Sequence, residues 1–170
     1  MATWTTPTTH VTGDTLAVSD WNALANDASF LYAAPYGLYY NSSGTSCGTG
    51  TTQVTLGGTT ASGYSFSVSS NNAVVPIAGI YTALFAVQMA SGAGGTTNDI
   101  QALVYQNGSP TLAGSAVPTY TGAPASSGGG CVKCVASATL GLYLYNATTS
   151  LTTFANAAAT FLHAFYVGST

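Results

Sequence analysis

The fold is decided by the stretch Gly79-Ile-Tyr-Thr-Ala-Leu-Phe-Ala-Val-Gln-Met-Ala90, the longest part of the chain in which residues alternate between two faces. Alternation with a period of two is typical of a β-strand. Turn-forming residues follow it at 91–97. We therefore expect a long strand over 79–90, with 99–106 as its hairpin partner and a turn at Asn107-Gly108.

The same period continues outward in short segments separated by turn residues. The expected strands are 37–41, 53–56, 64–68, 131–139, 140–146, 151–154 and 159–167. Residues 110–130 contain several prolines and Gly128-Gly129-Gly130, so we expect one weak strand and an exposed loop there. Roughly nine or ten short strands with turns between them are typical of a β-sandwich or jelly roll.

Charged residues are almost absent. The chain has one Lys or Arg and four Asp or Glu, 3% charged in all, whereas about a quarter of a typical soluble domain is charged. Nucleic acids and anionic membrane surfaces are bound by several basic side chains. Lys133 alone cannot supply them, so neither a nucleic acid nor a membrane is expected as a partner. The apolar fraction of 46% argues against disorder.

Targeting signals are also missing from the sequence. No apolar run reaches the roughly 18 residues of a membrane-spanning helix. The N-terminus has neither the basic nor the apolar region of a secretory signal peptide. We expect a protein that is made in a cytoplasm and not exported by the general route.

One segment, 19–32, departs from the period of two. Its apolar residues recur at the spacing of three and four that lines one face of a helix, with Trp21, Leu24 and Leu31 among them. Ser19 is the expected N-cap, and Asp20 follows it where the helix dipole favours a negative charge.

The chain thus divides into an arm and helix over 1–34 and one β domain over 35–170. Pro35 marks the boundary, because proline cannot continue a helix. The amphipathic helix has two alternatives: it packs on its own domain, or it binds another protein.

The first part of the chain contains three motifs, Trp4-Thr-Thr-Pro7, Val11-Thr-Gly13-Asp14 and Val18-Ser-Asp-Trp-Asn22, followed by Leu24 and Phe30-Leu31. This pattern resembles the N-terminal segment of tailed-bacteriophage virion proteins, which include small fibre, decoration and minor structural proteins. The resemblance implies that residues 1–34 attach to the virion. The anchoring residues would be Trp4, Pro7, Trp21, Leu24 and Leu31.

The β domain contains Ala78-Gly-Ile-Tyr81, Asn107-Gly108, Leu140-Gly-Leu-Tyr-Leu-Tyr145 and Thr160-Phe-Leu-His-Ala-Phe-Tyr-Val-Gly168. These motifs are similar to those of C1q/TNF-type jelly rolls, although Leu140-Gly141 stands where that family has Gly-Asp. In that fold the last strand lies near a trimer axis. The resemblance implies a homotrimer with Phe161, His163 and Phe165 in its interface.

His163 itself has two interpretations. Copies from the subunits of a trimer would meet as a pH-sensitive or ion-binding cluster, or the side chain is a hydrogen-bonded core or interface histidine. His10, in the arm, is expected to be structural.

The inventory of titratable residues is too small for most catalytic sites. General acid and base catalysis needs a positioned carboxylate or histidine with a partner, and the chain has only four Asp and two His. Three of the Asp lie in the arm and helix, and Asp99 opens a strand. We expect no enzyme, no catalytic residue and no cofactor.

Three cysteines, Cys47, Cys131 and Cys134, leave several alternatives. They are unpaired thiols, or Cys47 forms a disulfide with one of the other two. A zinc site usually needs four ligands, and residues three apart on a strand point to opposite faces. We therefore expect no metal site.

Several tyrosines are candidates for binding a sugar: Tyr105, Tyr120, Tyr143 and Tyr145. The best place is the loop expected over 111–130, which is tipped by Tyr120.

The two resemblances lead to one hypothesis of function. The chain would be a homotrimeric capsid decoration or head-fibre protein on the virion surface, anchored to the major capsid protein or another virion protein. The alternative is a tail-fibre or receptor-binding protein that recognises a host surface glycan.

Overall fold

The computed structural model describes residues 17–32, 34–63, 66–90, 99–118, 122–147 and 151–169. The chain divides into two units, 1–34 and 35–170. The helix and strands are α1 Val18–Tyr32, β1 Tyr36–Tyr40, β2 Ser46–Cys47, β3 Gly50–Gln53, β4 Gly58–Gly63, β5 Ser67–Ser69, β6 Asn72–Val74, β7 Gly79–Gln88, β8 Asp99–Gln106, β9 Ser109–Pro118, β10 Ala125–Cys134, β11 Thr139–Asn146, β12 Leu151–Thr152 and β13 Phe161–Gly168.

Helix α1 begins one residue earlier than predicted, and its cap is different. The backbone N–H of Ala17 donates to Oδ2 of Asp20 at 2.8 Å, and the carbonyl of Ala17 accepts from the N–H of Asp20 at 3.0 Å. Ala17 is therefore the N-cap, and Asp20 supplies the return bond of a capping box. The prediction of Ser19 as N-cap is wrong because Ser19 lies inside the first turn, whereas the first-turn position of Asp20 is confirmed.

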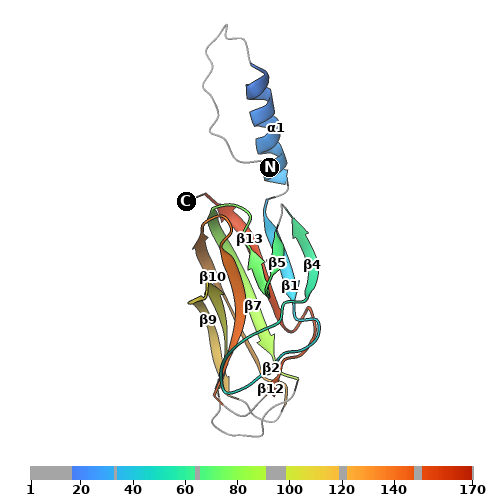
Figure 1. Cartoon of the computed structure of the whole chain (residues 1–170), viewed down its shortest axis with the longest axis vertical. Coiled ribbons are helices and arrows are strands. Elements are labelled where there is room, and N and C mark those ends of the chain that lie inside the picture. Colours follow the sequence, from blue (N-terminus) through green and yellow to red (C-terminus); the bar gives the residue numbers. More distant parts are fainter. Residues whose placement is uncertain are drawn as a thin grey trace. The chain divides into compact units, whose positions relative to one another are not determined.

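The domain formed by residues 35–170 is a sandwich of antiparallel sheets with jelly-roll topology (Figure 1). One sheet has the order β10-β7-β13-β1-β4, and the other has the order β5-β6-β11-β8-β9, with β3 also paired to β11. Strands β12 and β2 form a short third sheet. The predicted all-β jelly roll is confirmed.

Strand β7 carries the centre of the core. Its inward residues Tyr81, Ala83, Phe85 and Val87 are fully buried or nearly so. The facing strands of the other sheet bury Ile100, Ala102, Val104, Leu140, Leu142 and Leu144. Each large apolar side chain removed from water in this way contributes about 1.5–3 kcal/mol before entropy is counted. The alternating residues from which this strand was predicted therefore include the side chains that are buried in the core.

The predicted hairpin between 79–90 and 99–106 is wrong. Strand β7 pairs with β10 and β13, while β8 lies in the other sheet between β11 and β9. Asn107-Gly108 does form a turn, with φ of 51° and 80°, but it joins β8 to β9. Two consecutive positive φ angles are typical of the tight turns that fit the twist of a hairpin.

Residues 110–130 contain more strand than the one weak strand and exposed loop that were expected, because they form most of β9 and the first half of β10. Strand β10 pairs with β7 along its whole length, from Ala125 opposite Gln88 to Cys134 opposite Gly79. The strand expected over 131–139 therefore ends at Cys134. Residues 135–138 form a turn, and Thr139 is the first residue of β11.

The sandwich closes where β9 approaches β10 from the other sheet. A Cβ on Gly128 would lie 2.8 Å from Cα of Gly114, so only glycine allows the strands this close. The buried Oγ of Ser126 accepts from the N–H of Ala102 at 2.8 Å and donates to the carbonyl of Ser115 at 2.6 Å. One hydroxyl thus satisfies a backbone group in each of two strands of the opposite sheet.

Two buried tyrosines give a test of this core. Tyr81 donates to the carbonyl of Ile77 at 3.0 Å, whereas the hydroxyl of Tyr39 has no hydrogen-bond partner among the described residues. Tyr81→Phe should lower the free energy of unfolding by about 1 kcal/mol, and Tyr39→Phe should leave it unchanged or raise it. Chemical denaturation measures both variants, and an equal loss in the two would contradict this account.

Candidate functional site

The candidate site begins on the outward side of the last strand, β13. Phe161, His163 and Phe165 alternate with the buried Leu162 and Ala164, so they share one face, as the period of two predicted. The rings of Phe161 and His163 stack with centroids 4.3 Å apart, and Phe165 meets His163 edge-on at 6.4 Å. A continuous row of aromatic rings therefore runs along the strand.

Strand β1 extends this row on one side. Tyr36, Leu38 and Tyr40 lie opposite Phe165, His163 and Phe161 respectively. The rings of Tyr36 and Tyr40 lie over Gly63 and Gly58 of β4, where any Cβ would collide with them. The two glycines let the rings lie flat across the edge of the sheet.

Strand β7 extends the row on the other side. Its outward residues Thr82, Leu84 and Ala86 pair with the three residues of the β13 row, and Leu84 is 45% exposed. We call this combined surface the aromatic face. It consists of Tyr36, Leu38, Tyr40, Thr82, Leu84, Ala86, Phe161, His163 and Phe165.

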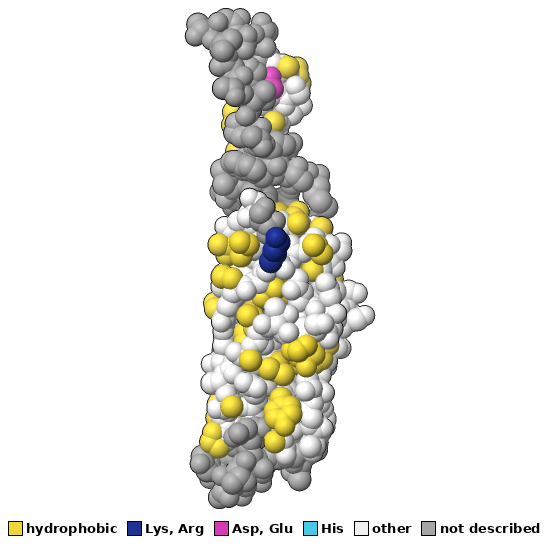
Figure 2. All heavy atoms as spheres, turned by 90° about the vertical axis from the view of Figure 1, so that its left-hand side faces the viewer, with side chains coloured by type: hydrophobic (Ala, Val, Ile, Leu, Met, Phe, Trp, Pro, Cys, Tyr) yellow, Lys and Arg dark blue, Asp and Glu magenta, His cyan; other side chains and the backbone are white. Residues whose placement is uncertain are grey.

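The aromatic face carries no carboxylate, lysine or arginine, and His163 is its one histidine. Lys133, the one Lys or Arg of the chain, lies in the same sheet, near the end of β10, where it pairs with Ile80 of β7. Figure 2 shows one basic side chain on the side it draws, and this is Lys133 because the chain has no other Lys or Arg. Burial in these apolar surroundings lowers the pKa of His163, because desolvation disfavours the charged imidazolium.

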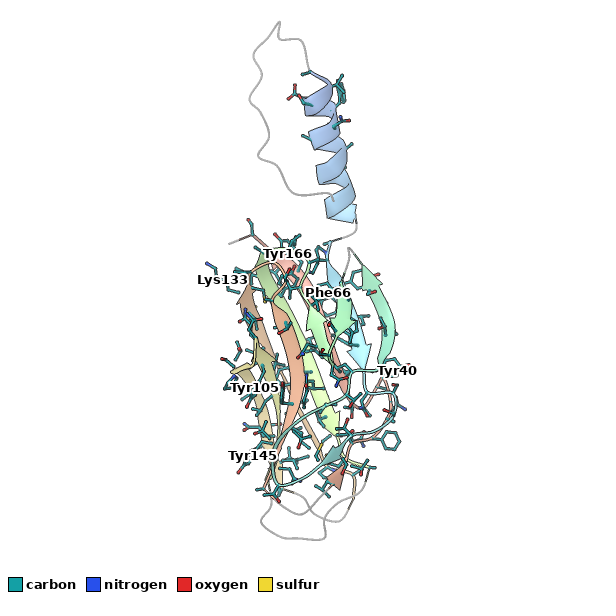
Figure 3. All side chains as sticks on the ribbon, viewed as in Figure 1. Tyr40, Phe66, Tyr105, Lys133, Tyr145 and Tyr166 are labelled. Atoms are coloured by element: carbon teal, nitrogen blue, oxygen red, sulfur yellow. The ribbon has the colours of Figure 1, made fainter. Side chains whose placement is uncertain are left out.

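The outward side of the six-stranded sheet carries a second group of aromatic residues. Tyr105 and Tyr143 stack with centroids 4.2 Å apart, and Tyr145, also on β11, is 42% exposed. We call Tyr105, Tyr143 and Tyr145 the tyrosine row. Figure 3 shows that Tyr105 and Tyr145 lie on the opposite side of the domain from Tyr40.

Amide side chains surround the tyrosine row. Nε2 of Gln53 donates to Oδ1 of Asn72 at 2.9 Å, and Nε2 of Gln101 donates to the carbonyl of Gly114 at 2.9 Å. The amides of Gln53 and Asn72 and the ring of Tyr143 crowd the space above Gly141, where a Cβ would meet Asn72 and Tyr143. Tyr120, the residue predicted to bind a glycan, lies outside the described residues.

The helical anchoring residues can be placed in part. Trp21 and Leu24 are 58% and 60% exposed, and their separation of three residues puts them on one side of α1. Trp4, Pro7 and the side chain of Leu31 lie outside the described part of the chain.

All three cysteines are free thiols, in contrast to the disulfide among the alternatives. Cys134 is buried in β10 opposite Gly79, and Cys131 is exposed on the other face of the same strand. Cys47 is buried in β2, where it pairs with Leu151. Because β10 is a regular strand here, the pair Cys131 and Cys134 cannot chelate one ion together.

Neither a metal centre nor a membrane span is found in the part of the chain that the structure describes. It holds no group of at least three His, Cys, Asp or Glu that could bind an ion. No helix in this part of the chain is both long and apolar enough to span a bilayer.

The strand order and the two packed sheets make residues 35–170 a TNF-like jelly-roll domain. The chain is similar to murine APRIL at pH 5.0, with a TM-score of 0.62 and 13% identity over 78% of this chain and 98% of that one. It is also similar to Eiger TNF from S. frugiperda, with a TM-score of 0.56 and 8% identity over 79% and 93% of the two chains. At these identities the likeness shows the fold alone. No protein-family model and no curated protein sequence matches the chain.

Sequence reasoning found the β13 row but missed its neighbours Tyr36, Leu38, Tyr40 and Leu84. The signal was present in Tyr-Gly-Leu-Tyr-Tyr of β1, where every second residue is large and apolar. The sequence alone does not show that these residues lie on the outer face of the sheet, because this depends on the pairing of β1 with β4 and β13.

The cysteines allow a chemical test of these placements. Burial raises the pKa of Cys47 and of Cys134 to about 11. Both thiols are therefore protected from alkylation, because a reagent cannot reach them and because little of either is present as the reactive thiolate. We expect no more than one thiol per native chain to react with a maleimide near neutral pH, and three after unfolding. Cys131→Ser should abolish native labelling, and labelling of Cys47 in the folded protein would contradict the structure.

Proposed function

We propose that this chain is a homotrimeric structural protein of a phage virion, a capsid decoration or head-fibre protein. The observation that carries the proposal is the aromatic face, an exposed apolar sheet surface on a domain that already has a complete core. Large exposed apolar patches mark interaction sites more often than chance surface. The nine residues that define the face include no formal charge except for a histidine.

Self-association through this face is favourable on physical grounds. Covering Leu84 and Phe165, which are 45% and 36% exposed, removes apolar area from water at about 25 cal/mol per Å². No ion has to be desolvated without a partner, which is the usual cost of burying a polar surface. Threefold symmetry is taken from the resemblance to C1q/TNF-type jelly rolls, whose last strand lies near the trimer axis.

Attachment to the virion belongs to residues 1–34. The exposed Trp21 and Leu24 supply an uncovered apolar stripe on α1, and the motifs around them resemble the N-terminal segments of phage virion proteins. The major capsid protein or another virion protein is the partner, and the protein functions on the virion surface after synthesis in the host cytoplasm. The small inventory of titratable groups supports a role without enzymatic activity.

A second candidate, recognition of a neutral host glycan by a tail-fibre or receptor-binding protein, is favoured by the tyrosine row. Stacked rings offer flat faces to the C–H side of a sugar, and the neighbouring amides offer polar partners to its hydroxyls. Strand tyrosines more often pack in cores or interfaces, so the structural function is preferred. The number of copies per virion separates the two candidates: hundreds support decoration, and a few to a few tens support a tail location.

Oligomeric state tests the role of the aromatic face. Sedimentation of the wild-type chain at micromolar concentration should give a trimer. Leu84→Asp should give a folded monomer, because the new carboxylate would be buried without a partner. Tyr145→Asp, at a similar exposure on the other sheet, is the matched control and should stay trimeric. The reverse pattern would assign the interface to the other sheet, and a monomeric wild type would refute the homotrimer.

Incorporation into particles tests the attachment role. Deletion of residues 1–34 should leave the trimer intact, because the domain has its own core, and should abolish its presence on purified virions. The double substitution Trp21→Ala and Leu24→Ala should reduce copy number at least tenfold, if the two side chains contribute the 2–4 kcal/mol typical of buried anchors, about 1.4 kcal/mol per tenfold. Quantitative mass spectrometry of virions measures both, and full retention of the deleted chain would contradict the proposal.

A further inference from the structure

His163 lies at the centre of the aromatic face. Its ring stacks on Phe161 with centroids 4.3 Å apart and meets Phe165 edge-on at 6.4 Å. Leu38 and Leu84 flank it on β1 and β7. Apolar groups therefore surround the imidazole within the plane of the sheet, and its open side is the side that a second copy would cover.

Among the described residues of β1, β7, β10 and β13, no carboxylate lies on the side of the sheet that His163 occupies. The titratable groups on this side of the neighbouring strands are Tyr36 and Tyr40 of β1 and Cys131 and Lys133 of β10, and β7 adds none. None of these four side chains is a carboxylate. Within residues 35–170 the one Asp or Glu is Asp99, which lies in β8 of the other sheet.

We infer that His163 makes the self-association of this chain sensitive to acid: a neutral imidazole lets a second copy cover the aromatic face, and an imidazolium opposes it. The inference rests on the proposed homotrimer and adds a form of regulation to it. A protonated imidazole covered by a second apolar face would be a buried charge without a partner, which is costly. The neutral ring packs as one more aromatic group in the row.

The sign of the pH dependence follows from linkage. Burial within one chain already lowers the pKa of His163, and coverage by a second copy removes more water and lowers it further. Dissociated chains therefore bind protons more tightly than the trimer. The association is fully present above the pKa of the free chain's His163 and is lost as the pH falls below it. With up to about three protons taken up per trimer, the association constant falls by up to about a thousandfold per pH unit.

Sedimentation of the full chain at about pH 7.5 and about pH 5, which bracket the titration of histidine, tests the inference. The wild type should be trimeric at the higher pH and dissociate at the lower one, with an unchanged far-ultraviolet circular dichroism spectrum. His163→Phe should remain trimeric at both, because it keeps the aromatic packing and removes the proton site. His163→Gln, which is also uncharged, serves if the phenylalanine variant does not fold. His10→Gln is the matched control and should dissociate in acid as the wild type does.

A wild type that stays trimeric at pH 5 overturns the inference and leaves the homotrimer standing. Acid dissociation of the uncharged His163 variants, or unfolding of the wild type at pH 5, also overturns it, since another group would then carry the response. Monomers at both pH values would instead refute the homotrimer, so the two failures are distinct.

Discussion

The register of β7 is the constraint on which the rest of the domain depends. Because a strand alternates its side chains, burying Tyr81 and Phe85 in the core commits Leu84 to the outer surface. Strands β13 and β10 pair with β7 on either side and follow the same alternation. The core and the aromatic face thus lie on opposite faces of the same sheet. A shift of one residue in the pairing register of β7 would exchange its buried and its exposed side chains. A substitution that disturbs the position of β7 therefore changes the aromatic face as well as the core.

Closure of the sandwich depends on the weakest part of the sequence. Strand β10 contains Ser-Ser-Gly-Gly-Gly, which has little intrinsic preference for a strand. It forms one because β7 offers it a long ladder, and because Gly128 can approach Gly114 in β9. Ser126 then bonds backbone groups of both β8 and β9. Small residues are needed here for the close approach of two sheets, so their loop-like composition has a structural cause.

This contrast explains how much of the fold and of the candidate site was predictable. Long segments with clear periods, β7, β13 and α1, were located correctly because one face of each is distinctly apolar. The pairing partner of β7 was wrong, and of β9 and β10 only one weak strand and the end of β10 were expected, since these strands depend on contacts between residues far apart in the chain. The same limit applied to the site: Phe161, His163 and Phe165 follow from one strand's period, but Leu38 and Leu84 join them only through cross-strand register.

The distribution of charge separates the two proposed interactions physically. Asp14, Asp20 and Asp27 place most of the chain's few charges in residues 1–34, whereas the aromatic face has none when His163 is neutral. Salt screens interactions between exposed charges and strengthens or leaves unchanged the burial of apolar surface. Association through the aromatic face should therefore tolerate salt but respond to acid, because His163 is the residue of this face that gains a charge by taking up a proton. The proposed attachment through α1 would add a salt-dependent contribution to its apolar contacts, since Asp20 lies in the first turn of the helix beside the exposed Trp21. The proposed trimer and the proposed attachment would therefore respond differently to salt and to acid.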